Sequence, residues 1–224
     1  MDVNRVLVVA PHGDDEVIGC GGSVARLAKR GAQVTVVVVT ERERSAAERA
    51  DPAERFEAES RRAADVLGIG EVVHLGVPDR DVRSDRALLT ALVGAIRRTR
   101  PDAGFLPHPG ERDEVHAAVS AAALQAVWMA ASPYFPEQGE AVAPADLVLG
   151  YEVWTPIAEP AFVQDISDVL AQKVEAMRAY ESQTAVTDFP AAIQGLAAYR
   201  GAMLGGTAFA EAFSVHQLHF PSWD

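Results

Sequence analysis

A short polar segment, Pro11–Glu16 with the sequence PHGDDE, concentrates groups that could do chemistry. It places the imidazole of His12 within a few residues of the carboxylates of Asp14 and Asp15. Imidazole nitrogen and carboxylate oxygen suit a borderline divalent ion such as Zn²⁺, but a catalytic zinc site usually has three protein ligands. A polar turn of this composition can also serve only to satisfy loose backbone N–H groups. The metal interpretation therefore needs a third ligand from elsewhere in the chain.

The third ligand is predicted to come from a loop that contains His108, Asp113 and His116. This loop follows the strand expected at 104–106, and in a doubly wound sheet the fourth strand often lies beside the first. Asp113 is suited to cap the next helix, which would place His116 in its first turn, near the strand ends. A single histidine is more often an ordinary loop residue. The expected adjacency of the two strands is what makes His116 the predicted ligand.

Strand and helix patterns alternate along the chain. The apolar run Val6–Ala10 is typical of a strand buried on both faces of a parallel sheet. Further strands are expected at 34–40, 72–75, 104–106, 147–154, 162–166 and 213–220, and helices at 23–30, 51–67, 84–96, 114–130 and 169–180. Asp51 and Ser84 are the expected caps of the second and third helices. Residues 132–144, with three prolines, are expected to form an irregular excursion that could face the substrate.

The alternation indicates the fold class. Parallel strands need crossover connections, and right-handed crossovers dominate. We therefore expect one α/β domain over residues 1–224, with a doubly wound, Rossmann-like, mostly parallel sheet that carries helices on both faces.

Composition excludes several classes of protein. Of the 224 residues, 49% are hydrophobic and 23% are charged, which is typical of a globular domain and excludes disorder as the main state. The formal net charge of −12 repels phosphate backbones and argues against nucleic acid as a partner. Cys20 is the only cysteine, so no intramolecular disulfide can form. With no signal peptide or transmembrane segment expected either, the sequence predicts a cytoplasmic protein.

The segment Pro11–Glu16 resembles the P-H-x-D-D-E signature of the PIG-L/LmbE-like family of zinc-dependent N-deacetylases. Weaker matches to other family elements follow along nearly the whole chain, at residues 59–68, 75–79, 180–183 and 210–213. The resemblance implies a hydrolase that removes an N-acetyl group from an amino sugar or glycoconjugate. It assigns His12, Asp15 and His116 to Zn²⁺ and Asp14 to the catalytic base, and it is compatible with a homo-oligomer. Such a ligand set also accepts Fe²⁺ or Mn²⁺.

Two positions depart from the family's pattern. Gly13 stands where the family usually has proline, which loosens the turn but removes no donor. The family's second motif is usually H-x-D-H, whereas residues 113–116 read D-E-V-H, so the histidine and aspartate before the third ligand are missing. In family members that histidine is thought to stabilise the oxyanion or to protonate the leaving amine. Asp113, His108 and His216 are the candidates for this role here.

The expected reaction divides the work between the ion and Asp14. A divalent ion can lower the pKa of its bound water to about 7 and polarise the acyl oxygen. Asp14 would accept the proton of the attacking water, and Asp14 or a neighbouring acid such as Asp113 would protonate the leaving amine.

Sugar hydroxyls need charged and amide groups as partners, and the resemblance makes candidates of Asp79, Gln183 and Glu211, with Arg55 a weaker one. Each of these residues could instead have only a loop or capping role. Five aromatic residues could line a site for the sugar: Trp128, Tyr134, Phe135, Tyr151 and Trp154. Aromatic side chains more often pack in the hydrophobic core.

Two other functions compete with the deacetylase interpretation. The missing histidine and aspartate favour a non-catalytic metal- or carbohydrate-binding protein of the same fold, which would bind an ion without turnover. Gly19, Gly21 and Gly22 follow the first strand as in a dinucleotide-binding oxidoreductase. However, Val24 stands where the G-x-G-x-x-G fingerprint needs its third glycine, and the adjacent carboxylates would repel a pyrophosphate.

Overall fold

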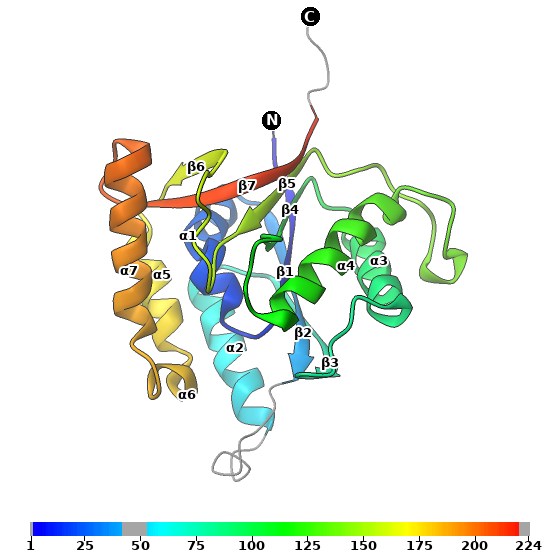
Figure 1. Ribbon diagram of the computed structural model, residues 1–224, viewed down its shortest axis with the longest axis horizontal. Coiled ribbons are helices and arrows are strands. Elements are labelled where there is room, and N and C mark those ends of the chain that lie inside the picture. The colour runs from blue at the N-terminus through cyan, green and yellow to red at the C-terminus, as the bar shows by residue number, and fades with distance from the viewer. Residues whose placement is uncertain (1, 42–52, 220–224) are drawn as a thin grey trace, which may run out of the picture.

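A computed structural model describes residues 2–41 and 53–219 and contains a seven-stranded sheet with helices on both faces (Figure 1). The strand order is β3-β2-β1-β4-β5-β7-β6. Five strands pair in parallel: β1 (Arg5–Ala10), β2 (Gln33–Glu41), β3 (Glu71–Pro78), β4 (Ala103–Pro107) and β5 (Leu147–Tyr151). β7 (Ala210–Leu218) runs antiparallel to β5 and to β6 (Phe162–Asp165). The predicted mostly parallel α/β fold is confirmed.

Two hydrophobic clusters pack on opposite faces of the sheet. Alternate residues of β1 supply them, because successive strand side chains point to opposite faces. Val6 and Val8 pack with α1 (Asp15–Lys29), α2 (Ala53–Leu67), α5 (Leu170–Arg178) and α7 (Phe189–Arg200). Leu7 and Val9 pack with α3 (Arg86–Thr99) and α4 (Glu114–Ala130). Figure 1 shows the two helical layers to the left and right of the sheet. Among the described residues, no helix combines the length and apolar composition needed to cross a membrane.

Helix α1 begins at Asp15, not at Ser23 as expected. Its glycines disfavour a helix by propensity, but two of them stand where the sheet and helix come into close contact. A Cβ on Gly19 would lie 2.1 Å from the Tyr151 ring, and one on Gly22 would lie 2.7 Å from Ile166. Close packing therefore overrides propensity, and the helix starts directly at the polar motif.

Several helix and strand boundaries differ from those predicted from the sequence. Asp85 caps α3 by accepting a hydrogen bond from Leu88 N at 3.0 Å, so the predicted cap at Ser84 is wrong. Asp51, the other predicted cap, lies outside the described residues. Strand β5 ends at Tyr151, three residues before the predicted end at Trp154, and the last strand spans 210–218 where 213–220 was expected. Helices α6 (Glu181–Thr184) and α7 were not predicted from the sequence.

The excursion at 132–144, which could face the substrate according to its sequence, is attached to α3 and lies outside the candidate cavity. It contains one short 3₁₀ turn, Pro136–Gln138. The buried Arg97 guanidinium of α3 holds the segment by donating hydrogen bonds to carbonyl oxygens of Met129, Ala130, Ser132, Tyr134, Phe135 and Gly139. No residue of 132–144 lines the large cavity described below.

Candidate active site

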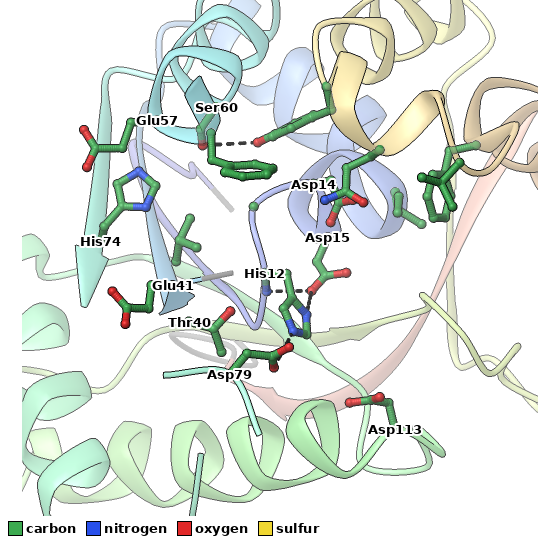
Figure 2. Close-up of a pocket in the computed structure, with 18 of the residues that line it drawn as sticks. His12, Asp14, Asp15, Thr40, Glu41, Glu57, Ser60, His74, Asp79 and Asp113 are labelled. Carbon is green, nitrogen blue, oxygen red and sulfur yellow. Dashed lines mark hydrogen bonds and ion pairs between the residues drawn. The ribbon is translucent and has the colours of Figure 1, made fainter. Parts of the chain in front are cut away.

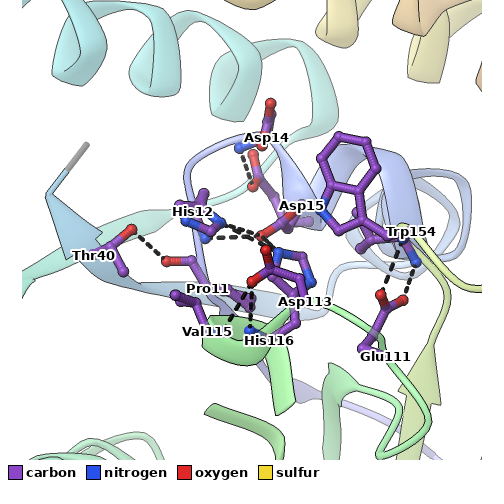
Figure 3. A network of polar contacts seen from close by, with 12 residues as sticks. Pro11, His12, Asp14, Asp15, Thr40, Glu111, Asp113, Val115, His116 and Trp154 are labelled. Atoms are coloured by element: carbon purple, nitrogen blue, oxygen red, sulfur yellow. Dashed lines mark hydrogen bonds and ion pairs between the residues drawn. The ribbon is translucent and has the colours of Figure 1, made fainter. Parts of the chain in front are cut away.

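The loop after β1 and the start of α4 meet at one edge of the sheet (Figure 3). They do so because β1 and β4 are hydrogen-bonded neighbours that run in parallel. Asp113 caps α4 by accepting hydrogen bonds from Val115 N at 2.9 Å and His116 N at 3.3 Å. His116 consequently lies in the first helical turn and faces His12 of the β1 loop. The predicted strand adjacency and helix cap are both confirmed.

Three potential ligand atoms form a nearly equilateral triangle. His12 Nδ1 lies 3.3 Å from His116 Nε2 and 3.4 Å from Asp15 Oδ2, and His116 Nε2 lies 3.3 Å from Asp15 Oδ2. In a tetrahedral zinc site with bonds of about 2.0–2.1 Å, neighbouring ligand atoms lie about 3.3 Å apart. The chemistry and spacing of these donors therefore fit one face of a tetrahedral divalent cation site.

Asp79 orients the first of these ligands. Its Oδ1 lies 3.1 Å from His12 Nε2, and this hydrogen bond is the main reason that the pKa of Asp79 is lowered. Asp79 is thus ionised and accepts the bond, which leaves His12 Nδ1 to face the ligand triangle. Burial lowers the pKa of His12, but the carboxylates of Asp15 and Asp79 outweigh burial and raise it to about 10. The electrostatics that favour a proton on this ring also favour a cation beside it.

Asp14 has an unusual backbone. Its φ of 129° lies in a region that non-glycine residues rarely adopt, and such strain is often found at functional sites. Its N–H donates to Glu16 Oε2 at 3.0 Å, and Glu16 Oε1 accepts from the Tyr180 hydroxyl at 2.6 Å. Burial raises the pKa of Glu16 to about 7, although these hydrogen bonds oppose the shift. Glu16 therefore supports the turn that presents Asp14 to the cavity (Figure 2).

A cavity of about 860 Å³ opens over the triangle and includes His12, Asp14 and Asp15 in its wall. Its wall includes several polar side chains, and Figure 2 shows Glu41, Glu57 and His74 on one side of His12. We call this side the polar arm and define it by Thr40, Glu41, Glu57 and His74. Arg80 also lines the cavity and approaches two carboxylates: its Nε lies 3.6 Å from Asp79 Oδ2 and its guanidinium 3.4 Å from Asp113 Oδ2.

The cavity includes some of the predicted site residues. Asp79, Asp113 and Gln183 line it. Burial raises the pKa of Asp113, but the backbone N–H groups that it caps, the nearby His116 and Arg80 lower it overall. Asp113 is therefore ionised near neutral pH and is unsuited to donate a proton to the leaving amine.

Two predicted substrate contacts lie elsewhere. Arg55 does not line the cavity, and its Nε is 3.2 Å from Glu59 Oε1 on the same helix. Glu211 is buried beneath α1, where its carboxylate accepts from Gly22 N, Ser23 N, Ser23 Oγ and Lys173 Nζ. Every one of these donors is internal to the fold, so the structure gives Glu211 a structural role.

His108 and His216 do not replace the missing histidine. His108 Nε2 bonds to Thr155 O at 2.7 Å and lies 3.4 Å from Glu111, and His216 Nε2 lies 3.0 Å from Ser214 Oγ. Neither histidine lines the cavity. Among the three candidates for the missing role, only Asp113 reaches the cavity wall.

The family model for PIG-L, GlcNAc-PI de-N-acetylase, matches residues 7–127, which is more than half of the chain. The chain belongs to this family. A diacetylchitobiose deacetylase from Thermococcus kodakarensis is 29% identical over 198 residues, which cover 81% of this chain and 71% of the relative.

Solved structures also resemble this PIG-L protein. The conserved protein TT1542 from Thermus thermophilus is 30% identical, with a TM-score of 0.86 and coverage of 99% of both chains. A 4-carboxy-2-hydroxymuconate hydratase from Pseudomonas putida is 22% identical, with a TM-score of 0.82 and coverage of 98% of both chains. At that identity the hydratase shows a shared fold alone.

The C-terminal part of the PIG-L protein, beyond the matched segment, completes the cavity. It supplies Trp154, Tyr180 and Phe189. Of these three, only Trp154 was predicted from the sequence as a residue of the cavity wall. Phe189 follows Asp188, which caps α7, and Pro190 lies in the first turn; this N-terminal signal could have revealed the helix. Of the other proposed aromatic residues, Tyr151 is fully buried and Trp128 is 67% exposed outside the cavity.

Glu111 had no recognisable sequence signal. It is buried, and its carboxylate accepts from the backbone N–H groups of Val153, Trp154 and Thr155 at 2.8, 3.1 and 3.3 Å. Glu111 thereby joins the loop after β4 to the loop after β5 (Figure 3). Only the folded chain brings this carboxylate to those three donors.

Proposed function

We propose that this PIG-L protein is a metal-dependent amide hydrolase that removes the N-acetyl group of an amino sugar or glycoconjugate. His12, Asp15 and His116 would hold a divalent cation, Zn²⁺ first and Fe²⁺ or Mn²⁺ as alternatives. The observation that carries the proposal is the ligand triangle with sides of 3.3–3.4 Å beside Asp14 in the wall of a large cavity. The deacetylase activity named for the Thermococcus relative supports the same substrate class.

The two adjacent aspartates have different tasks. When bound, the cation would polarise the acyl oxygen and make an attacking water more acidic. Asp15 Oδ2 faces both imidazoles and accepts from His12 N at 2.8 Å, so it is committed to the ligand set. Asp14 lines the cavity and would accept the proton of the attacking water, then deliver it to the leaving amine nitrogen.

Asp113 and its neighbours would act on the substrate without giving up a proton. The lowered pKa of Asp113 keeps it as an acceptor, paired with Arg80. Substrate hydroxyls would bond to Gln183 and to the second oxygen of Asp79, whose first oxygen already holds His12. The single buried cysteine, Cys20, is in keeping with a cytoplasmic location, which we include in the proposal.

The test is release of acetate and a free amine from N-acetylglucosamine and diacetylchitobiose. We expect a chelator to abolish the activity and added Zn²⁺ to restore it. Asp14→Asn should lower kcat by at least about 100-fold while the variant still binds metal. Asp85→Asn is the matched control, because Asp85 caps α3 away from the cavity and asparagine caps equally well. Chelator-insensitive activity, or an Asp14→Asn enzyme as fast as the parent, would contradict the proposal.

A non-catalytic metal- or carbohydrate-binding protein is the second candidate. The observation that favours it is the ionised Asp113 at the position where family members usually have an imidazole. This candidate predicts cation binding at His12, Asp15 and His116 with no acetate release from any substrate. Metal titration of the same preparations, run beside the assay, separates the two functions.

A further inference from the structure

The cavity is also lined by apolar side chains that do not belong to the polar arm. Ile18, Trp154, Val186 and Phe189 line it, and we call these four residues the apolar arm. The Trp154 and Phe189 rings contact each other edge to face, with centroids 6.0 Å apart. Figure 3 shows Trp154 on the far side of Asp15 from Thr40, which belongs to the polar arm. The two arms therefore extend from the ligand triangle in different directions.

Buried carboxylates hold the backbone of the loop that carries Trp154, although Trp154 itself is 44% exposed. Glu111 binds the backbone N–H groups of residues 153–155. Buried Glu152 accepts from Ile157 N and pairs with Arg200, which also donates to Ile157 O at 2.7 Å. An exposed aromatic side chain on a loop whose backbone is already ordered leaves less conformational freedom to be lost on binding, which favours a ligand contact.

The geometry of an amide assigns one substituent to each arm. The acyl carbon carries its chain on one side and the amine nitrogen on the other, so the two substituents leave the reacting centre in different directions. The sugar hydroxyls need hydrogen-bonding partners, and Thr40, Glu41, Glu57 and His74 offer them. An acyl chain needs apolar surface, and the volume of about 860 Å³ lies in the upper part of the range for small-molecule sites.

We propose that the apolar arm is an acyl subsite, and that the preferred substrate carries an unbranched N-acyl chain longer than acetyl, such as butyryl or hexanoyl. This inference rests on the proposed amide hydrolase function. The reaction is the same hydrolysis: water adds its oxygen to the acyl carbon, the C–N bond breaks, and a carboxylic acid and a free amine form. No further co-reactant is needed.

The experiment compares N-acetyl, N-butyryl and N-hexanoyl glucosamine as substrates of the metal-loaded protein. Burial of one methylene changes an equilibrium or rate constant roughly fourfold, so kcat/KM should rise at least about tenfold from acetyl to hexanoyl even if the four added methylenes are only partly buried. Trp154→Ala should lower the hexanoyl-to-acetyl ratio of kcat/KM at least about tenfold, because the lost contact corresponds to roughly two buried methylenes. Trp128→Ala, which removes an exposed indole outside the cavity, is the matched control and should keep the parent ratio.

A second variant and a binding measurement keep the outcome decisive. Val186→Ser alters a side chain that is 75% exposed, so folding should be unaffected, and the ratio should again fall. Calorimetry on metal-loaded Asp14→Asn protein should show tighter binding of N-hexanoyl than of N-acetyl glucosamine. Equal affinities, a flat kcat/KM series, or a ratio unchanged by Trp154→Ala would overturn the acyl subsite. Tighter hexanoyl binding without hydrolysis of any substrate by the parent would support the apolar arm and refute the hydrolase.

Discussion

Asp15 and Glu211 are buried to almost the same degree, with side chains 3% and 4% exposed, yet their surroundings differ. Glu211 accepts from Gly22 N, Ser23 N, Ser23 Oγ and the Lys173 ammonium at 2.6–2.8 Å. Lys173 also donates to Ile18 O at 2.9 Å, so this cluster ties α5 and β7 to α1. Its donors are permanent parts of the fold, and they leave no place for a ligand.

Asp15 faces a different kind of partner. Besides His12 N, its Oδ2 faces the ring nitrogens of His12 and His116, which can hold a proton or a cation. Burial raises the pKa of Asp15, but the two imidazoles outweigh it and lower the pKa overall. Burial of a carboxylate therefore does not mark function in this protein. The exchangeable character of its partners is what distinguishes Asp15 from Glu211.

The largest expected effect is that of Asp15→Asn. The amide oxygen can still accept from His12 N, but the ligand set loses its only negative charge. We expect metal binding to become undetectable at micromolar concentrations and kcat/KM to fall at least about 1000-fold. The unfolding free energy of the metal-free protein should change by no more than about 1 kcal/mol. Normal metal binding by this variant would show that the triangle is not the cation site.

The reverse pattern is expected for Lys173→Met. Removing the ammonium leaves the Glu211 charge buried with neutral donors only, which should destabilise the protein by about 3–5 kcal/mol in urea unfolding. The double variant Lys173→Met/Glu211→Gln should recover part of this loss, because no unpaired charge remains. Metal affinity of the folded single variant should equal that of the parent. A loss below about 1 kcal/mol would contradict the structural role of the cluster.

Asp79→Asn should have the smallest effect of the three, because Asp79 supports a ligand without being one. An amide at this position orients the His12 ring less strongly, and metal affinity measured by chelator competition should fall about 10–100-fold. Asp102→Asn is the control, since Asp102 bonds Asn4 N and Arg5 at the start of β1, the other end of that strand. Equal affinities for the two variants would remove Asp79 from the metal centre.

Local patterns in the sequence were sufficient to predict the parts of the site that lie at strand and helix ends. The run Val6–Ala10 predicts a buried strand because its side chains are apolar on both faces, and β1 follows it closely. Asp113 was predicted as a cap from its residue type and position, and it is one. The adjacency of His12 and His116 followed from the usual strand order of doubly wound sheets, which the chain adopts.

Residue type alone could not separate the proposed substrate contacts from structural carboxylates. Glu211 and Asp79 are equally plausible partners for a hydroxyl when only the sequence is read. Their difference arises from Lys173 and His12, which lie 38 and 67 residues away and meet them only in the fold. The early start of α1 was missed for a similar reason, because the glycines that argue against a helix fit against Tyr151 and Ile166.

The amino-acid sequence by itself determined which elements form and which groups stand at their ends, because periodicity, capping and apolar runs act over a few residues. It thereby determined where the proposed metal ligands and the proposed base stand. Only the tertiary structure decided which carboxylates have all their hydrogen-bond partners inside the fold, and that Glu111 and Glu152 hold the Trp154 loop. It also decided which side chains share the cavity wall. These features depend on contacts between distant segments, whose partners no local pattern specifies.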